Sequence, residues 1–271
     1  MRFPDSLSDA AVAVLQTEAP AEKVELTRAF AAAWRNGQIT EVGRTQPPHR
    51  PARPARPALL APRDMPRRRI SRDAAGRIAL LHAIAHIELN AIDLAWDIIA
   101  RFAGEGLPPG FHDDWVAVAD DEARHHALLA ARLADLGATY GDLPAHDGLW
   151  QAAEETAHDL LARLAVVPLV LEARGLDVTP GMIAKLKAVG DAESVAILQV
   201  IYDDEIGHVA AGKRWFDWLC RERDLAPRET WQDLVRRHFR GRLKAPFNAE
   251  GRDAAGFHAA FYEPLAGLPS A

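Results

Sequence analysis

Two stretches of the chain carry the pattern Glu-x-x-His, first as Glu122 and His125 and again as Glu205 and His208. Side chains three residues apart lie on the same face of an α-helix. Each pair can therefore offer a carboxylate and an imidazole to one metal ion. The repeat predicts metal-ligand chemistry at two places in the sequence.

The position of each pair in the helical register strengthens this interpretation. Glu122 lies in the middle of an apolar stripe formed by Trp115, Val118, Ala119, Leu129 and Leu133. Glu205 lies in a similar stripe formed by Leu198, Ile201, Val209, Phe216 and Leu219. A third pair, Glu155 and His158, precedes Glu172 on the same expected helix. The separation is roughly 20 Å along the helix axis, which is too far for this pair to join the same cluster.

Two further glutamates complete the set of inward-facing acids. Glu88 shares a helical face with Leu81, Ile84, Ile92 and Ile99, whereas the opposite, polar face carries His82, His86, Asn90, Asp93 and Asp97. Glu172 shares a face with Leu161, Ala165 and Leu169. The lone glutamate precedes the paired glutamate by 34 residues in one half and by 33 in the other, so the site geometry is duplicated.

Four carboxylates that converge in an apolar interior require cations, because a buried unpaired charge costs several kcal/mol. One glutamate from each of two helices and one Glu-x-x-His pair from each of two others form the ligand inventory of a site with two metal ions. Such ligands suit iron or manganese, so we expect two iron ions, with manganese or a mixed iron and manganese pair as alternatives. The competing interpretation is four unrelated acids at helical spacing.

The elements that must position these ligands are four long amphipathic helices, expected at residues 72–103, 111–136, 149–174 and 191–222. Glycines such as Gly137 and Gly175 are expected to end them. The connection between the second and third helices is long enough to cross most of a bundle. The fold class expected is all-α, a ferritin-like four-helix bundle with one long crossover. Shorter helices are expected at 180–188, opened by Pro180, and at 227–240.

The N-terminal part differs in composition from this bundle. Residues 1–43 are expected to form a helical appendage of one or two helices, capped by Ser6 or Ser8 and reopened by Pro20. Residues 44–70 form an arm rich in proline and arginine, with seven prolines between positions 47 and 66. Residues 71–271 are expected to form the metal-binding bundle with a C-terminal helix and tail. Proline excludes helix interiors and central strands, so the arm is expected to be extended.

Charge is distributed unevenly over the 271 residues, whose formal net charge is −6. Residues 44–72 carry nine arginines and one acid, whereas residues 73–271 carry a net charge of −12. The arm can bind an anionic partner such as RNA, or it can dock on its own acidic body, which we favour. Cys220 is the only cysteine, and neither a signal peptide nor a membrane span is evident, so a soluble cytoplasmic protein is expected.

The ligand order resembles that of the ferritin-like di-metal carboxylate superfamily. The stretches HIELNAIDLAWD, DDEARHHALLAARLADLG, YGDLPAHDGLW, LEARGLD and IYDDEIGHVAAG resemble a bacterial ferritin-like family catalogued as a domain of unknown function. This resemblance covers about residues 70–265. A weaker likeness links the LEAR motif and the ligand order to the di-iron hydroxylases that modify tRNA.

Both motifs are preceded by an aspartate, Asp121 in the first and Asp204 in the second. This is similar to the bacterial multicomponent monooxygenases, and the similarity implies that these aspartates hydrogen-bond the ligand histidines. The alternative is two solvated acids. Tyr202, one turn before Glu205, is a candidate catalytic residue or a plain core tyrosine. His126 is expected to be a core histidine.

These observations favour a di-iron oxidoreductase that activates dioxygen or a peroxide to oxidise or hydroxylate an unidentified substrate, using an unidentified electron donor. The alternative is a ferritin-like protein that binds or handles iron without an organic substrate. The spaced pair His82 and His86 faces away from Glu88, so a separate metal site there is not favoured. The sequence leaves the oligomeric state open.

Overall fold

The computed structural model describes residues 3–61, 64–66 and 73–267, and these residues form an all-α helical bundle fold, as expected. No strand occurs within these ranges, where pairing of extended backbone is limited to two isolated bridges. The chain divides into two compact units. The first contains the described residues up to Trp150 together with Lys185–Ile197, and the second contains Gln151–Ala184 and the described residues from Leu198 onward.

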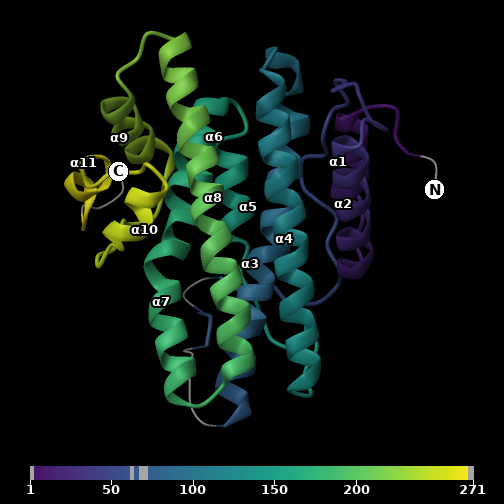
Figure 1. The fold of residues 1–271 in the computed structure, drawn as a ribbon, viewed down its shortest axis with the longest axis vertical. Coiled ribbons are helices and arrows are strands. Elements are labelled where there is room, and N and C mark those ends of the chain that lie inside the picture. The colour runs from purple at the N-terminus through teal and green to yellow at the C-terminus, as the bar shows by residue number, and fades with distance from the viewer. Residues whose placement is uncertain (1–2, 62–63, 67–72, 268–271) are drawn as a thin grey trace. The chain divides into compact units, whose positions relative to one another are not determined.

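The first unit is built on two long helices, α3 (Ala74–Arg101) and α4 (Pro109–Asp135). The short 3-10 turn η2 (Ala103–Glu105) joins them, so they run antiparallel. The N-terminal helices are α1 (Leu7–Leu15) and α2 (Pro20–Arg35), of which α1 packs on α3 and α2 packs on α4 (Figure 1). The predicted starts of both are confirmed, because the Ser6 side chain accepts a hydrogen bond from the Asp9 backbone and Pro20 opens α2.

The remaining helices lie mostly in the second unit, and α5, α7 and α8 each also have residues in the first. In chain order they are α5 (Gly148–Glu155), α6 (Leu160–Val166), the π-helix η3 (Val167–Glu172), α7 (Ala173–Ala188), α8 (Ala192–Glu222), α9 (Pro227–His238), α10 (Ala249–Ala254), α11 (Ala259–Tyr262) and the 3-10 turn η4 (Glu263–Leu265). Within this unit α9 packs on α6 and α11. The helices expected at 191–222 and 227–240 are thus confirmed.

The single helix expected at 149–174 is wrong in two ways. It is interrupted after Glu155, and a new helix starts at Leu160, capped by Asp159, whose side chain accepts a hydrogen bond from the Leu161 backbone. It also continues past Gly175 instead of ending there. Gly175 lies inside α7, where a Cβ would make an ordinary van der Waals contact of 3.9 Å with the Glu205 side chain.

The separate helix expected at 180–188 is also wrong, because Pro180 lies inside α7. A proline in a helix leaves the carbonyl four residues earlier without its usual donor. That carbonyl belongs to Leu176, and it accepts a hydrogen bond of 3.0 Å from the Asn248 side chain instead. Asn248 thereby allows the helix to pass through the proline.

The arm docks on the first unit, as favoured from its charge. Arg53 contacts Asp93 at 2.9 Å and Asn90 at 2.6 Å, and Arg50 pairs with Asp147. The Pro48 carbonyl accepts a hydrogen bond from Arg101. Docking is therefore confirmed for residues 48–53. Arg67, Arg68 and Arg69, the residues on which we would test RNA binding, lie outside the described ranges.

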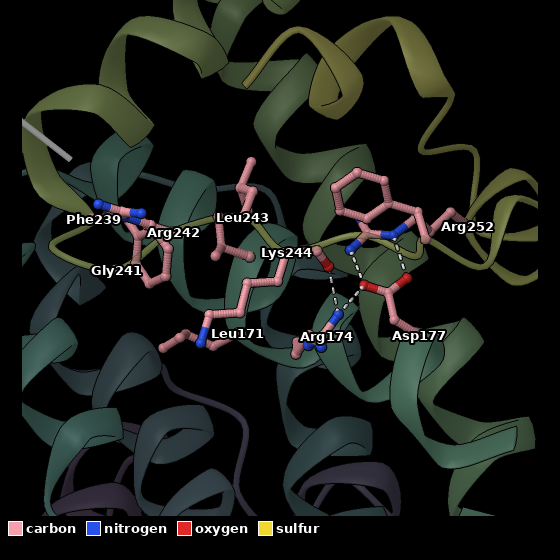
Figure 2. Close-up of a pocket in the computed structure, with 11 residues that line it drawn as sticks. Leu171, Arg174, Asp177, Phe239, Gly241, Arg242, Leu243, Lys244 and Arg252 are labelled. Carbon is pink, nitrogen blue, oxygen red and sulfur yellow. Dashed lines mark hydrogen bonds and ion pairs between the residues drawn. The ribbon is translucent and has the colours of Figure 1, made fainter. Parts of the chain in front are cut away.

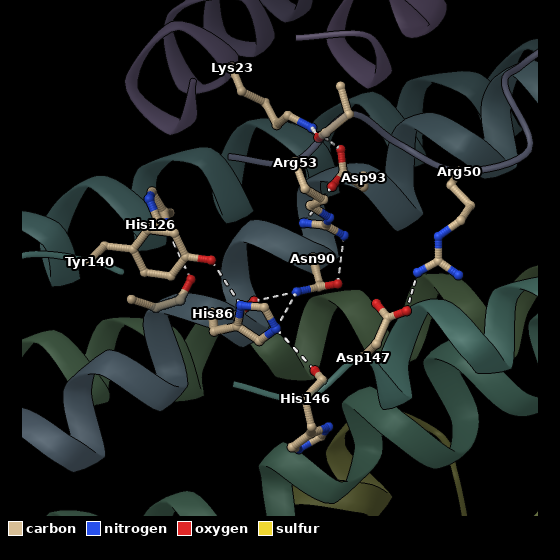
Figure 3. A network of polar contacts seen from close by, with 12 residues as sticks. Lys23, Arg50, Arg53, His86, Asn90, Asp93, His126, Tyr140, His146 and Asp147 are labelled. Atoms are coloured by element: carbon tan, nitrogen blue, oxygen red, sulfur yellow. Dashed lines mark hydrogen bonds and ion pairs between the residues drawn. The ribbon is translucent and has the colours of Figure 1, made fainter. Parts of the chain in front are cut away.

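The polar face of α3 is buried, although its composition resembles that of a solvent-facing helix side. All five of its polar residues are at most 6% exposed: His82, His86, Asn90, Asp93 and Asp97. Figure 3 shows Arg53 between Asp93 and Asn90, with the contacts continuing from Asn90 to His86. Lys23 of α2 also reaches Asp93, at 2.5 Å. The arm and α2 thus supply the charges that this face needs in order to be buried.

One helical stretch, Ala74–Glu105, is long and apolar enough to cross a membrane by length and composition alone. However, 78% of its most apolar window is buried inside the protein. Such burial is expected of the core helix of a soluble protein.

Candidate metal centre

The first unit brings three of the predicted ligands together. Glu88 comes from the middle of α3, and Glu122 and His125 come from the middle of α4. The His125 Nδ1 atom lies 3.1 Å from Glu88 Oε2 and 3.4 Å from Glu122 Oε2. One ligand atom from each residue lies within 4.8 Å of the others. This is the compact, three-residue geometry that can hold a single metal ion.

The electrostatics of this group reflect its burial. Burial and the neighbouring charge of Glu122 raise the pKa of Glu88 to about 8. Burial also opposes protonation of His125, but hydrogen bonds and charge from Glu122 and Glu88 outweigh it and raise the pKa of His125 to about 11. Without a cation, the group therefore retains protons that isolated side chains would have released at neutral pH.

The residues present fit a divalent cation. Glu88, Glu122 and His125 are at most 3% exposed, so water does not screen the repulsion between the two carboxylates. A cation placed among two carboxylates and an imidazole would replace the retained protons as the compensating charge. The donor set consists of two carboxylates and one imidazole and contains no thiolate.

The second unit holds the other Glu-x-x-His pair. Glu205 and His208 lie on α8, with His208 Nδ1 at 3.8 Å from Glu205 Oε2, and both side chains are buried. Glu172, 9% exposed, ends η3 in the same unit. Gly175, one turn later, lies against the Glu205 side chain. The packing thus sets the helix that carries Glu172 beside the helix that carries Glu205.

The π-helix that carries Glu172 was not predicted. Pro168 is its second residue, and a Cβ added to Gly212 of α8 would lie only 2.4 Å from the Pro168 Cβ atom. This contact shows that η3 and α8 approach closely at a glycine. Single π-turns inside helices occur frequently at functional sites. A proline within an otherwise helical run was the sequence signal that could have revealed this irregularity.

The remaining predicted site residues lie around the ligands. Asp121 pairs with Arg124 at 3.0 Å, and Asp204 is half-buried. Their predicted hydrogen bonds to the ligand histidines stay predictions. The Tyr202 hydroxyl accepts a hydrogen bond of 2.8 Å from Asn248, so it is tied to the start of α10. A catalytic role for Tyr202 likewise stays a prediction.

Two other histidines hold the long connection after α4 in place. His82 Nε2 accepts a hydrogen bond from the Gly141 backbone at 2.9 Å, and His86 Nδ1 lies 2.8 Å from the Tyr140 hydroxyl (Figure 3). Burial lowers the pKa of His86 to about 4, so its ring is neutral. These contacts show that both rings anchor the connection that follows α4.

Two further histidine motifs also have contacts of their own. His126 Nδ1 lies 2.9 Å from the Ala85 carbonyl, as expected of a core histidine. In the third Glu-x-x-His pair, Glu155 pairs with Arg240 at 2.8 Å and the His158 ring contacts His238. The same spacing therefore produces a surface ion pair here and a buried ligand group elsewhere.

Comparison with known proteins places the chain among uncharacterised relatives. A family model described as "Protein of unknown function (DUF455)" matches residues 16–263. An uncharacterised protein of Haemophilus influenzae is 43% identical over 206 residues, which cover 73% of this chain and 70% of that protein. No solved structure matches the chain. The matches agree with the expected family of unknown function, and their names carry no activity.

Proposed function

We propose that this chain, which belongs to the protein family of unknown function DUF455, is a metal-dependent oxidoreductase with a ferritin-like arrangement of helices. One ion would be held by Glu88, Glu122 and His125, and a second by Glu172, Glu205 and His208. The observation that carries the proposal is the burial of Glu88, Glu122 and His125 within 4.8 Å of one another. A bound cation would compensate the two buried carboxylates in place of the protons that the group otherwise retains.

Iron is the metal we propose, with manganese as the alternative. Carboxylates and imidazoles are ligands that both metals accept, and the only cysteine, Cys220, is not among them. A single buried cysteine also fits a reducing compartment such as the cytoplasm. Bound iron would supply the capacity to bind and reduce dioxygen or a peroxide, and so to oxidise or hydroxylate an organic substrate.

The side chains of this protein would contribute geometry and exclusion of water. Glu88 and Glu122 come from the centres of two antiparallel helices, so their carboxylates are held by rigid backbone. The apolar neighbours of these residues in α3 and α4 keep water out, which strengthens each electrostatic interaction within the group. In the second unit, Asp204 and Tyr202 are the residues we propose to orient the ligands or take part in proton movement.

Metal analysis tests the proposal directly. After anaerobic loading with ferrous iron and removal of excess metal, we expect about two ions per chain. Magnetic coupling between the ions, measured by Mössbauer spectroscopy of the oxidised protein, would support a pair. Protein that retains no iron, manganese or other transition metal after loading would contradict the proposal.

Oxygen titration then separates an enzyme from a protein that handles iron. The loaded, reduced protein is expected to consume oxygen in a fixed ratio to its iron and to accumulate no mineral. Uptake of iron that continues far beyond the ligand capacity would favour the alternative, iron handling without an organic substrate. The variant Glu155→Ala is the matched control, because it removes the glutamate of the surface Glu-x-x-His pair.

A further inference from the structure

The second unit contains a pocket that the metal ligands do not use. Its volume is about 260 Å³, near the lower bound of ~300 Å³ usual for small-molecule sites. The end of η3, the first turns of α7, residues 239–247 and α10 all contribute to its walls. Figure 2 shows Arg174, Asp177 and Arg252 joined by contacts on one side of the pocket, and Phe239 and Arg242 on the other.

The pocket is strongly basic. Four of its lining residues are cationic, namely Arg174, Arg242, Lys244 and Arg252, against one acid, Asp177. Arg252 neutralises that acid through two hydrogen bonds of 2.8 Å, and both side chains are at most 2% exposed. The surplus of positive charge therefore rests on the other three side chains.

These three cationic side chains differ in their contacts with other protein groups. Arg174 donates to the Lys244 carbonyl at 2.7 Å, and it lies 3.4 Å from Asp177. Arg242 and Lys244 are exposed, and within the described part of the chain neither side chain has an ion-pair partner. Their charges are available to a ligand, while Arg174 fixes the backbone that carries them.

The rest of the lining is apolar. Val170 and Leu243 are buried, and Leu171, Phe239 and Phe247 are half-buried at the pocket surface. An apolar wall beside unpaired cations matches a ligand with a hydrocarbon body and one anionic end. The small volume excludes a bulky ligand such as a dinucleotide.

We propose that this pocket binds a small organic anion, a carboxylate or a phosphate monoester that carries a compact apolar group. The apolar group contacts Leu171 and Leu243, and the anion is bound by Arg242 and Lys244. The binding itself does not require the metal.

The floor of the pocket is linked to the helix that carries the second pair of metal ligands. Asp177 Oδ1 accepts a hydrogen bond from the Asn248 backbone, and the Asn248 side chain donates to the Tyr202 hydroxyl. Tyr202 lies three residues before Glu205 on α8. If the proposed oxidation is correct, this anion is the substrate class that the pocket selects, a statement that rests on the proposed function.

Isothermal titration of the full-length protein with four probes tests the binding. Benzoate and phenyl phosphate combine an anion with an apolar ring, benzyl alcohol lacks the charge, and inorganic phosphate lacks the ring. We expect benzoate or phenyl phosphate to bind at least about tenfold more tightly than both incomplete probes. The stronger of the two distinguishes a carboxylate from a phosphate ligand. Equal binding of all four probes, or none, would overturn the proposal.

A matched pair of double variants locates the site. Arg242→Gln with Lys244→Gln removes two charges at the pocket, and Arg228→Gln with Arg236→Gln removes two exposed charges from α9 of the same unit. Only the first is expected to weaken the preferred probe, by about tenfold or more. Leu171→Glu, at a half-buried position, should abolish binding by placing an acid in the apolar wall. Equal affinities in the two double variants would show that the anion binds elsewhere.

Discussion

The two Glu-x-x-His groups share their spacing in sequence but differ in their surroundings. The group of the first unit is at most 3% exposed and lies on α4, where it faces Glu88 of α3. The other face of α3 is closed by the arm and α2. The group of the second unit lies on α8 beside the π-helix η3. The C-terminal residues of η3, Val170 and Leu171, line a pocket. The Glu-x-x-His spacing thus identifies the candidate ligands, whereas the elements packed around each group determine which other molecules can reach it.

The largest expected effect is loss of metal, and it tests whether the two groups act separately. Glu122→Ala and Glu205→Ala should each lose about one of two bound ions, because each removes a carboxylate ligand from one group. Elemental analysis of the purified variants provides the measurement.

Two controls accompany this experiment. Glu155→Ala and His82→Ala should keep the full metal content, because these side chains contact Arg240 and the Gly141 backbone. Equal metal loss in Glu155→Ala would show that the helical facing assigned to the ligands is wrong.

The closed face of the first unit depends on Arg53. Arg53→Gln should lower the free energy of unfolding by about 3 kcal/mol, because it leaves the buried Asp93 with one cation fewer. Arg50→Gln is the matched control in the same arm. Its pair with Asp147 is partly exposed, so it should cost less than about 1 kcal/mol. Similar losses in a urea titration would contradict the special role of the buried pair.

In the second unit, packing depends on a glycine instead of a charge network. Gly212→Ala should destabilise the protein by about 1–3 kcal/mol, because the added methyl would collide with Pro168. Gly181→Ala, in α7, meets no atom within 4 Å and should stabilise by up to about 1 kcal/mol. Thermal unfolding of both variants gives the measurement. Equal melting temperatures would contradict the close contact between η3 and α8 at Gly212.

The smallest effect is a pH dependence in the first unit. The pKa of His86 is about 4 in the folded protein, against an ordinary value of 6.5. Between these values the unfolded chain binds the proton and the folded protein does not, so stability falls as the pH is lowered from 6.5 towards 4. The loss should be on the order of 2 kcal/mol. Chemical denaturation at several pH values should show a flatter slope in His86→Gln than in the original protein, whereas an exposed control, His258→Gln, should retain the slope.

The long helices could be predicted from the sequence because each has a sustained apolar period and clear end signals. Residues 72–103 and 191–222 were assigned within two residues of α3 and α8. The helix expected at 149–174 failed because Gly175 and Pro180 were interpreted through local rules. The helix continues through Pro180 because Asn248, which is distant in sequence, donates to the carbonyl that the proline leaves without its helical donor.

The candidate ligands could be predicted for the same reason, since an acid in the middle of an apolar stripe can be recognised from the sequence alone. The structure brings Glu88 to His125 and Glu205 to His208, as the register indicated. The pocket could not be predicted, because it collects residues from η3, α10 and the irregular segment 239–247. The burial of the polar face of α3 could not be predicted from the sequence either, because a buried polar face and a solvated one have the same composition.

The bond between Asn248 and the Leu176 carbonyl has a consequence for how the family can diverge. Pro180 removes a helical donor, and Asn248, far along the chain, replaces it while also holding Tyr202. A lineage that lost Asn248 while keeping the proline would carry an unsatisfied carbonyl in α7. Relatives without Pro180 should therefore place one constraint fewer on residue 248, whose contact with Tyr202 does not depend on the proline.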